Sequence, residues 1–596
     1  MVERIPIGID DFRRLRELGL AYVDKTHLIR RLIDDTGIEV TLAPRPRRFG
    51  KSLNLSMVRW YFEKRDEDLS SLFEGLSIWG AGEEYRHHFQ RYPVIYITFK
   101  GIKAASWELG WEEVRRKIAQ LFDEHRYLLE GGRMSARDAR EYAAVLDGTA
   151  SRAAYQSALL DLSRLLHQHH GERALILIDE YDEPLHAAYV HGYAKDAIGF
   201  YRAFFTEGLK GNPHLWKGVL TGILRVARES IFSGLNNLAV YSLLRPEMGS
   251  CFGFTEPEVA ALLARAGLAE SLDEVRGWYN GYLFGGTVVY NPWSILSYIQ
   301  SEDHLLRNYW VNTSSNDLVR EMLGRHALVI EAEIETLLQG GSIERKVNDN
   351  IAFDELAQSA GAVLDLLLFS GYLRAEPMGE PTRTEGIYRL SIPNREVREV
   401  YATTFQRWMV ERLGAGEPGI VRLKRALFEG DAEGLTEALS TFTSRVLSYH
   451  DLQTRRDQAS DPMLLSPRVY PEQVMQVFVL GLLATLEPEY EVRSNRESGS
   501  GRPDVLIRAR APGKPGVVLE LKVAKPKVKS PEAALREGLA QIRKHDYLSE
   551  LRAAGSSPAF AFAVAFDGKR VWVRRASEGK GKTVRAAGKR AKAKKG

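Results

Sequence analysis

The strongest constraint on the fold is an alternation of apolar runs and amphipathic stretches over the first 245 residues. The four apolar runs are IEVTLAP (38–44), YPVIYITF (92–99), ALILIDE (174–180) and LWKGVLTGI (215–223). Each has the length of a buried strand, and the segments between them are long enough for helices. Strands that alternate with helices indicate a parallel sheet with crossover helices, so we expect an α/β domain over residues 1–245.

The rest of the chain is too long to share that core, and its pattern changes several times. The predicted fold class is therefore α/β multidomain. The predicted parts are a helical lid region (246–345), a winged-helix-like domain (346–410), a helical connector (411–465), a second α/β domain (466–575) and a disordered basic tail (576–596). The winged-helix expectation rests on AVLDLLLFSGYLRAE followed, after a Gly- and Pro-rich gap, by GIYRLSIPNREVREVYATTF.

Composition and charge indicate a cytoplasmic protein with one basic end. Cys251 is the only cysteine, which excludes an internal disulfide and suits a reducing cytosol. The start, MVERIPIGIDDF, has acids where a signal peptide would be apolar, and the longest apolar run (474–486) is too short to span a bilayer. The last 21 residues hold eight Lys or Arg and one Glu, whereas the whole chain has a net charge of only +4. Basicity therefore belongs to the tail and not to a broad face.

The sequence Gly50-Lys51-Ser52 ends a loop between the first predicted strand and the amphipathic stretch SLNLSMVRWYFEK. This is the context of a phosphate-binding loop, in which Lys51 would reach the β- and γ-phosphates and Ser52 would hold Mg²⁺. The first glycine of the usual pattern is replaced by Arg45, and Gly-Lys-Ser alone is common. The loop by itself leaves both interpretations open.

A second half of a nucleotide site follows the third and fourth strands. Asp179 and Glu180 come directly after an apolar strand, where Asp179 suits a Mg²⁺ shell and Glu180 could polarise an attacking water. The alternative is a solvated strand end. At the end of the fourth strand, Thr221 could sense the γ-phosphate and Arg225 or Arg228 could sense charge, although a surface helix start with ordinary arginines explains the pattern equally well.

Seven segments in order give the chain a family resemblance. They are IPIGIDDF, AYVDKT, RPRRFGKSLNLSM, LIDEYDEP, TGILRVARESIFSGLNNL, FGFTEPEV and WYNGYLFG with VYNPWSIL. Together they resemble the AAA-ATPase-like proteins of bacteria, which often carry a PD-(D/E)XK nuclease-like domain at the C-terminus. The resemblance implies that the arginine-rich loop is usual in this family and that its extra arginines offset phosphate charge. The nucleotide residues expected on these grounds are Arg45, Arg47, Arg48, Gly50, Lys51, Ser52, Asp179, Thr221 and Arg225.

The C-terminal α/β region has the residue types of a metal-dependent nuclease. Asp504 opens one predicted strand, and Glu520 and Lys522 stand two apart in VVLELKV, so they share a face. Asp followed by Glu-x-Lys across a hairpin matches the PD-(D/E)XK core. Asp504, Glu520 and the carbonyl of Leu521 could hold Mg²⁺, and Lys522 could orient a water or stabilise charge on phosphorus. A surface hairpin with unrelated charges is the alternative.

This site can form only with a particular pairing of the two strands. For Asp504 to face the Glu520 side, the numbers of paired residues must sum to an even total, which requires an odd loop or a bulge and not a six-residue turn. Helper residues are Glu472 on the first helix of the domain, which a favourable helix dipole also explains, and Gln541, by analogy with similar nuclease cores. Glu497 is either a helper or a solvated loop acid. Lys525, Lys527, Lys529 and the tail are candidates for contacts with nucleic-acid phosphates, or are simply solvated.

These patterns predict an ATP- and Mg²⁺-dependent enzyme, in which an ATPase gates or positions a nuclease that acts on nucleic acid, DNA being favoured. The alternative function is a nucleotide-controlled switch that binds nucleic acid or protein with weak or no cleavage. An RNA-directed nuclease stays open, because nothing in the sequence reads a 2′-hydroxyl. No membrane partner is expected, and a homo-oligomer is left open.

Overall fold

The computed structural model describes residues 4–224, 231–232, 235–310, 330–338, 340–349, 359–378, 386–401, 417–446, 479, 483, 486, 489–494, 503–524, 530–567 and 570–576. The chain divides into two compact units, Met1–Tyr401 and Ala402–Gly596, and each is described by itself. Within the described residues, no helix is both long and apolar enough to cross a membrane.

The first unit is built on a five-stranded parallel sheet in the order β2-β3-β4-β1-β5. Its strands are β1 (Val40–Pro44), β2 (Val94–Thr98), β3 (Ala174–Asp179), β4 (Leu215–Gly222) and β5 (Leu238–Val240). The first four coincide with the four predicted apolar runs, and the predicted parallel sheet is confirmed. Every residue of β1 and β3 is buried, as expected for strands covered on both faces.

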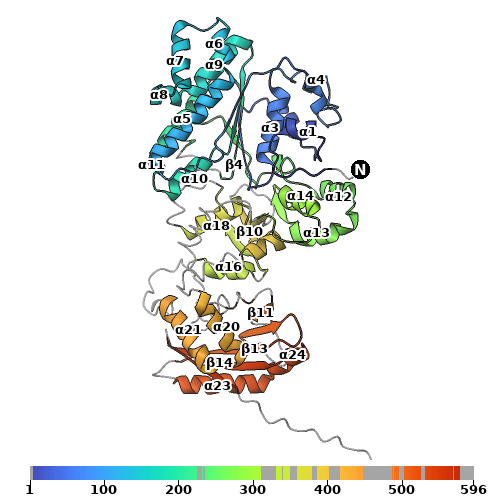
Figure 1. The fold of residues 1–596 in the computed structure, drawn as a ribbon, viewed down its shortest axis with the longest axis vertical. Helices are drawn as coiled ribbons and strands as arrows, with labels where there is room; N and C mark the ends of the chain where they lie inside the picture. Colours follow the sequence, from blue (N-terminus) through green and yellow to red (C-terminus); the bar gives the residue numbers. More distant parts are fainter. Residues whose placement is uncertain are drawn as a thin grey trace, which may run out of the picture. The chain divides into compact units, whose positions relative to one another are not determined.

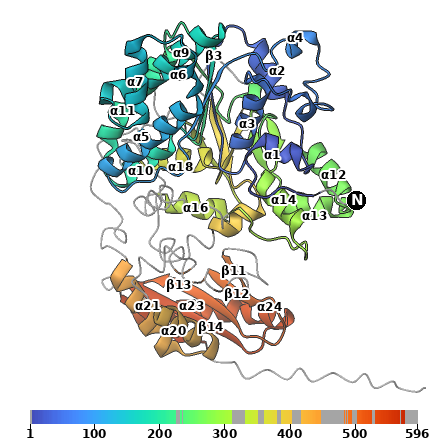
Figure 2. The ribbon, with the colours of Figure 1, turned by 45° about the horizontal axis from the view of Figure 1, so that its top comes forward.

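Helices cover both faces of this sheet (Figures 1 and 2). Helix α3 (Lys51–Phe62) packs against β2, β3 and β4. On the other face lie α5 (Trp107–Glu124) and α9 (Ala158–His170), with α7 (Ala136–Leu146) and α11 (Ala194–Leu209) beside them. The shorter helices of this region are α1 (Phe12–Glu17), α2 (His27–Asp34), α4 (Glu83–Arg86), α6 (Tyr127–Glu130), α8 (Arg152–Gln156) and α10 (Glu183–Val190).

The region predicted as a helical lid contains α12 (Glu256–Arg265), α13 (Leu272–Tyr279) and α14 (Pro292–Gln300), together with a hairpin of β6 (Tyr282–Phe284) and β7 (Thr287–Val289). Local chemistry fixes the helix starts. Thr255 and Glu258 form a reciprocal capping box at α12, and the Asn291 side chain accepts hydrogen bonds from two backbone N–H groups at the start of α14.

A small three-stranded antiparallel sheet follows in the order β8-β10-β9. Its elements are β8 (Ile343–Lys346), β9 (Arg374–Pro377) and β10 (Ile387–Ser391), with α16 (Glu331–Leu338) and α18 (Ala360–Phe369) nearby in the chain. The helix, strand and strand predicted within 346–410 are present as α18, β9 and β10. Strand β8 begins inside the region predicted to be a helical lid. Its sequence, IERK, carries no apolar run, so the sequence did not indicate a strand there.

The second unit contains a five-stranded mixed sheet in the order β11-β12-β13-β14-β15, in which only β13 and β14 pair in parallel. The strands are β11 (Tyr490–Ser494), β12 (Val505–Ala509), β13 (Gly516–Val523), β14 (Ala559–Asp567) and β15 (Arg570–Arg575). Helices α23 (Pro531–His545) and α24 (Tyr547–Ala553) pack on one face.

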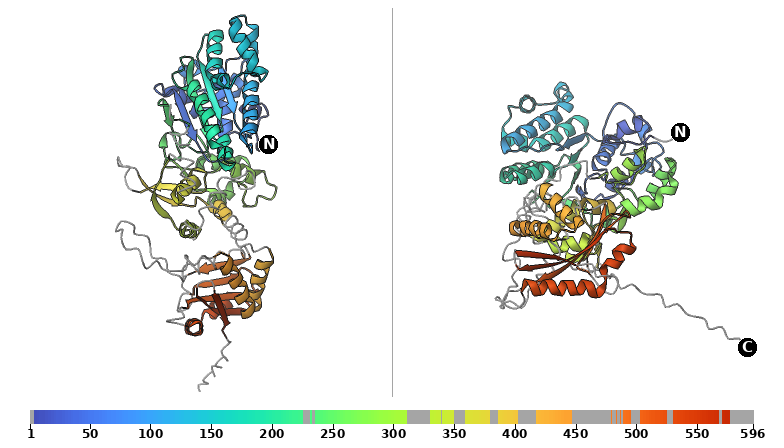
Figure 3. Two further views of the ribbon diagram at one scale, coloured as in Figure 1. Left: turned by 90° about the vertical axis from the view of Figure 1, so that its left-hand side faces the viewer. Right: turned by 60° about the horizontal axis from the view of Figure 1, so that its bottom comes forward.

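The opposite face of this sheet is covered by α20 (Glu417–Glu429) and α21 (Ala432–Val446), as Figure 3 shows. Leu427 and Leu435 are buried in one apolar cluster with Val517, Leu519 and residues of β14. The helical connector predicted for 411–465 is therefore, in its described part, a layer of the C-terminal unit. Sequence patterns could not reveal this, because an amphipathic helix does not specify the surface that it covers.

Candidate functional site

The loop between β1 and α3 has the backbone of an anion-binding turn. Arg48 and Gly50 both adopt left-handed conformations, with φ of 69° and 79°. Left-handed residues that alternate with right-handed ones bring successive N–H groups together, and α3 adds the positive end of a twelve-residue helix. This arrangement attracts phosphate oxygens.

Lys51, the first residue of α3, is buried and points back into this loop. Its Nζ donates hydrogen bonds to the carbonyl oxygens of Arg45, at 3.0 Å, and Pro46, at 3.1 Å. Burial lowers the pKa of the amine, and the nearby acids Glu180 and Asp179 oppose that effect. An ammonium group held only by neutral carbonyls gains charge complementarity when an anion enters the loop.

Ser52 and Thr221 both donate hydrogen bonds to the buried carboxylate of Asp179. The distances are 2.6 Å from Ser52 Oγ to Asp179 Oδ2 and 2.6 Å from Thr221 Oγ1 to Asp179 Oδ1. A serine hydroxyl and a carboxylate in contact at the end of β3 are oxygen ligands of the kind that Mg²⁺ prefers. The described residues therefore fit a magnesium ion between Ser52 and Asp179, with Thr221 orienting the carboxylate.

Glu180 has an unusual backbone and a perturbed carboxyl group. Its φ is 49°, a left-handed value that is uncommon for a residue other than glycine. Burial raises the pKa of Glu180 to about 8, and a hydrogen bond with Glu183 contributes, whereas Lys51 acts in the opposite direction. Glu183 is itself held by the N–H of Gly101 at 3.1 Å and by Lys103 at 3.3 Å. Burial and the contact with Glu183 therefore favour the protonated form of Glu180.

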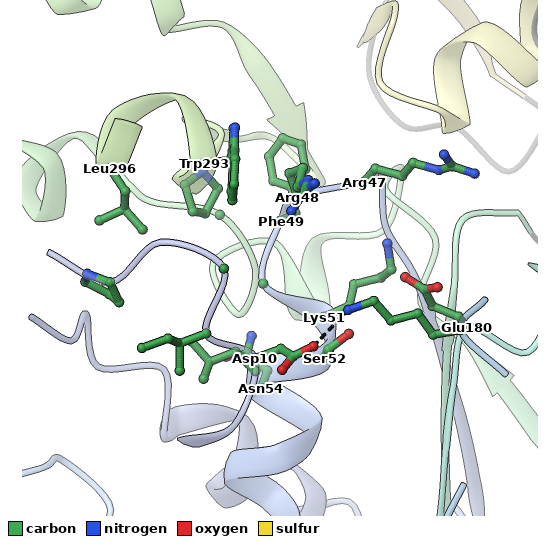
Figure 4. A pocket seen from close by; sticks show the side chains of 18 of the residues that line it. Asp10, Arg47, Arg48, Phe49, Lys51, Ser52, Asn54, Glu180, Trp293 and Leu296 are labelled. Atoms are coloured by element: carbon green, nitrogen blue, oxygen red, sulfur yellow. Dashed lines mark hydrogen bonds and ion pairs between the residues drawn. The ribbon is translucent and has the colours of Figure 1, made fainter. Parts of the chain in front are cut away.

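Lys51, Ser52, Glu180 and Glu183 border one pocket of about 690 Å³, within the range of small-molecule sites, whereas Asp179 and Thr221 are not among its lining residues. Lys51, Ser52 and Glu180 lie toward one end of it in Figure 4, and Trp293 and Leu296 lie toward the other. The apolar end is extended by Ala21, Val23, Phe254 and Leu262, which pack in one cluster with Leu296. The pocket thus combines an apolar end with an end suited to phosphate.

The second candidate site lies on β12 and β13. Val505 pairs with Leu519 and Ile507 with Val517, so the paired numbers sum to an even total and Asp504 stands opposite Glu520. The loop between the last paired residues, Ile507 and Val517, has an odd number of residues, as is required if Asp504 and Glu520 are to share a face. The six-residue turn is excluded.

Asp504, Glu520 and Lys522 converge on one face of this hairpin. Asp504 Oδ2 accepts a hydrogen bond from the N–H of Leu521 at 2.7 Å. Lys522 Nζ lies 2.8 Å from Glu520 Oε1 and 3.8 Å from Asp504 Oδ2. The charges of two acids and one amine therefore meet within hydrogen-bond or ion-pair distance.

The Glu520 carboxylate is the most buried of these three side-chain groups and has one oxygen without a hydrogen-bond partner among the described residues. Its side chain is 0% exposed, and its Oε2 has no hydrogen-bond partner among the described residues. Burial and then the charge of Asp504 raise its pKa to about 7, while Lys522 lowers it. A buried carboxylate oxygen without a partner fits a divalent cation, which would reverse these electrostatics.

Comparison with known proteins identifies both regions. Residues 6–232 match the family model described as "Predicted AAA-ATPase". Residues 470–576 match the model of the PD-(D/E)XK nuclease superfamily. A protein of Azotobacter chroococcum mcd 1, described as "Uncharacterized protein in vnfD 5'region", is 30% identical over 403 residues, which cover 66% of this chain and 68% of the relative. The chain belongs to the AAA-ATPase-like proteins with a C-terminal PD-(D/E)XK domain. The predicted family is thereby confirmed.

In this AAA-ATPase-like protein, Arg45 does not line the pocket, which corrects the prediction that it binds nucleotide. The side chain is 0% exposed and donates hydrogen bonds to the carbonyl oxygens of Pro44, Tyr241 and Met248 at 2.6–3.0 Å. Its guanidinium also lies over the ring of Phe252. Arg45 therefore anchors the loop to the segment that follows β5. The family resemblance associated Arg45 with phosphate because of its position in the loop. The sequence does not indicate the direction in which the Arg45 side chain points.

The other two loop arginines do line the pocket. Arg48 lies over the ring of Trp293, with 4.1 Å from Cζ to the ring centroid. The carbonyl of Arg47 accepts hydrogen bonds from Asn291 Nδ2 and Trp310 Nε1, each at 3.4 Å. The ATPase-like loop is thus held by the region of α14, which sequence patterns did not connect with it. Arg225 and Arg228 lie outside the described residues.

The PD-(D/E)XK domain places Gln541 on α23 and adds a residue that the sequence did not single out. Tyr547 is buried, and burial raises the pKa of its phenol, with the Gln541 side chain acting in the opposite direction and the charges of Glu520 and Asp504 raising it further. Tyr547 therefore lies near the acids of the site, and Gln541 is next to Tyr547. Glu472, Glu497, Lys525, Lys527, Lys529 and the tail from 577 lie outside the described residues.

Proposed function

We propose that the protein binds and hydrolyses ATP at the pocket beside α3, and that its C-terminal domain cleaves phosphodiester bonds in DNA with the help of Mg²⁺. The observation that carries the nuclease half is the buried Glu520 Oε2, which has no hydrogen-bond partner in the described part of the chain and lies opposite Asp504 and beside Lys522. Nucleotide and divalent-metal use are general properties of the two domain types to which the chain belongs.

In the ATPase half, the apolar end of the pocket suits a base and the loop end suits a triphosphate. Lys51 would exchange its loop carbonyls for phosphate oxygens, and Ser52 and Asp179 would hold Mg²⁺. Bound Mg²⁺ neutralises phosphate charge and orients the terminal phosphate. Glu180 would orient the attacking water and, in its ionised form, accept the proton of that water.

In the nuclease half, Asp504, Glu520 and the carbonyl of Leu521 would hold the metal ion, which lowers the pKa of bound water and offsets the charge of the scissile phosphate. Lys522 would leave its contact with Glu520 as the ion takes over that carboxylate. Its amine would then donate a hydrogen bond to the attacking water or to a phosphate oxygen.

A nuclease assay on duplex and single-stranded DNA and on RNA, with Mg²⁺ or chelator and with or without ATP, tests this proposal. We expect cleavage of DNA only with Mg²⁺, its loss in Glu520→Gln, and a change in rate when ATP is added. Nucleic-acid binding without cleavage of any substrate would instead favour a nucleotide-controlled binding protein. Phosphate release from ATP, measured for the same samples, reports the ATPase half separately.

A further inference from the structure

Lys100 lies at the edge of the sheet where the ATPase site is built. Strand β2 runs beside β3, and Thr98 is level with Asp179. The N–H of Phe99 donates a hydrogen bond to the Asp179 carbonyl at 3.0 Å. Lys100 is the next residue, and its side chain lines the pocket with Glu180. The register of the parallel sheet therefore brings a lysine to the hydrolytic end of the site.

The ammonium group of Lys100 is held by an exchangeable partner. Its Nζ lies 2.8 Å from Asp10 Oδ2, and the two side chains are 55% and 57% exposed. Asp10 borders the same pocket, opposite the strand ends from which Glu180 extends (Figure 4). Ion pairs as exposed as this contribute little to stability, so a triphosphate can displace Asp10 at small cost.

The electrostatics of Lys100 agree with this position. The hydrogen bond to Asp10 raises its pKa, and the charges of Glu180 and Asp179 raise it further. The Lys100 amine therefore interacts electrostatically with both acids that are proposed to act on the terminal phosphate and on the attacking water. It stays protonated at neutral pH and can supply a full positive charge.

Three other cations near the loop make contacts of their own. Lys51 donates hydrogen bonds to loop carbonyls, which it is proposed to exchange for phosphate oxygens, Arg45 is anchored outside the pocket, and Arg48 stacks on Trp293. Phosphoryl transfer spreads negative charge over the oxygens of the transferred group, and enzymes of this kind place a cation there. Among the described lysines that line the pocket, Lys100 is paired with an exposed acid, whereas Lys103 is paired with Glu183, itself only 12% exposed.

We propose that Lys100 is a catalytic residue of ATP hydrolysis, which leaves Asp10 on triphosphate binding and donates a hydrogen bond to an oxygen of the terminal phosphate. This inference rests on the proposed ATPase function. In the reaction, the water oxygen bonds to the γ-phosphorus, the bond to the β–γ bridging oxygen breaks, and ADP leaves with that electron pair. The proton of the water passes to Glu180, and Lys100 stays protonated throughout.

The test compares Lys100→Ala and Lys100→Arg with the unaltered full chain, using Mg²⁺-ATP for turnover and ADP for binding. We expect Lys100→Ala to lower kcat by about 100- to 1,000-fold. The Kd for ADP should stay within about twofold, since ADP lacks the terminal phosphate. Lys100→Arg should recover part of the rate. Lys210→Ala removes an exposed lysine after α11 that does not line the pocket, and it should behave like the unaltered protein.

Asp10→Asn distinguishes catalysis from a structural ion pair. If Lys100 acts on the phosphate, Asp10→Asn should lower kcat much less than Lys100→Ala does, because the amine is still present. An equal loss in Asp10→Asn and Lys100→Ala would overturn the inference, as would a kcat for Lys100→Ala equal to that of the unaltered protein. If the unaltered protein does not hydrolyse ATP, the proposed function fails and this inference fails with it.

Discussion

Arg45 and Lys51 stand at the two ends of one loop and are expected to differ in role. Arg45 should stabilise the fold and Lys51 should bind the ligand, and substituting each in turn separates these two effects. Arg45 is buried with three carbonyl partners, whereas the buried Lys51 borders the pocket. Removing the guanidinium leaves buried carbonyls without donors and opens a cavity, which costs several kcal/mol.

We therefore expect Lys51→Ala to lose most of its affinity for ATP while its melting temperature falls less than that of Arg45→Ala, because Lys51 has two carbonyl partners and borders the pocket. Arg45→Ala should lower the melting temperature strongly. Calorimetric titration with ATP and thermal unfolding measure the two effects. Equal ATP affinity in Lys51→Ala would contradict the assignment of the phosphate loop.

A second residue-scale prediction concerns the C-terminal acids. Glu520→Gln removes the charge that would hold a metal ion, so both metal affinity and cleavage should fall. Lys522→Met keeps the buried stem but removes the ammonium, so metal affinity should persist while cleavage slows by about a hundredfold, or ~3 kcal/mol. Metal titration followed by cleavage assays on the same samples checks this division. Loss of metal binding in Lys522→Met would show that the lysine maintains the site's shape instead.

At the scale of elements, Glu396 joins α14 to the segment that ends the first unit. It is 0% exposed and accepts hydrogen bonds from Ser294 Oγ at 2.8 Å and from the N–H groups of Tyr309 and Trp310 at 2.8 and 2.9 Å. Trp310 and Asn291 in turn donate to the Arg47 carbonyl of the phosphate loop. One buried carboxyl group thus supports the helix that borders the pocket.

Burial raises the pKa of Glu396 from 4.5 to about 7. Between these values the folded protein holds the proton more tightly than the unfolded chain, so this contribution is complete below pH 4.5 and is lost as pH rises toward 7. We expect Glu396→Gln to gain stability relative to the original protein between pH 5 and pH 8, by up to about 3 kcal/mol. Melting temperatures across this range measure it, and Glu399→Gln controls for the loss of one charge. Parallel pH profiles would contradict the effect.

The helices α20 and α21 give another element-scale prediction. They bury one face of the C-terminal sheet, including Leu519 and Leu521 on the strand that carries Glu520. A fragment that starts at residue 466 would expose that face to water. It should aggregate or bind a hydrophobic dye, whereas a fragment that starts before Glu417 should unfold cooperatively. Cooperative unfolding of the shorter fragment would mean that the helices are accessory.

The sequence predicted elements well where one chain segment carries the whole signal. The four apolar strands follow from local patterns, and strand parity gave the condition under which Asp504 shares a face with Glu520, which the observed register meets. Strand β5 is only three residues long and partly exposed, so it gives no apolar run. The direction of Arg45 and the placement of Lys100 beside Asp179 depend on packing between segments distant in the chain. Contacts of this kind cannot be predicted from the local sequence pattern.

At the scale of the whole molecule, the separation of charge suggests a role for the tail. Eight Lys or Arg lie beyond the last strand, in a chain with a net charge of only +4. Deletion of residues 577–596 keeps Ala576, whose N–H bonds to Ala561. It should weaken DNA binding at low salt and reduce the slope of log K against log salt by about 0.9 for each DNA phosphate that the tail neutralises. The catalytic rate at saturating DNA should be unaffected, and an unchanged slope would mean that the tail does not touch the DNA.

The opening segment of the chain has a practical consequence for anyone who purifies this protein. Pro6, Gly8 and Ile9 border the pocket, and the chain reaches them within a few residues of Met1. An affinity tag joined at this end would place flexible, often histidine-rich sequence near the proposed nucleotide pocket and the residues proposed to hold magnesium. It could then compete for metal or slow ligand exchange in assays. A cleavable tag elsewhere, or complete removal before measurement, keeps the measured nucleotide chemistry that of the protein.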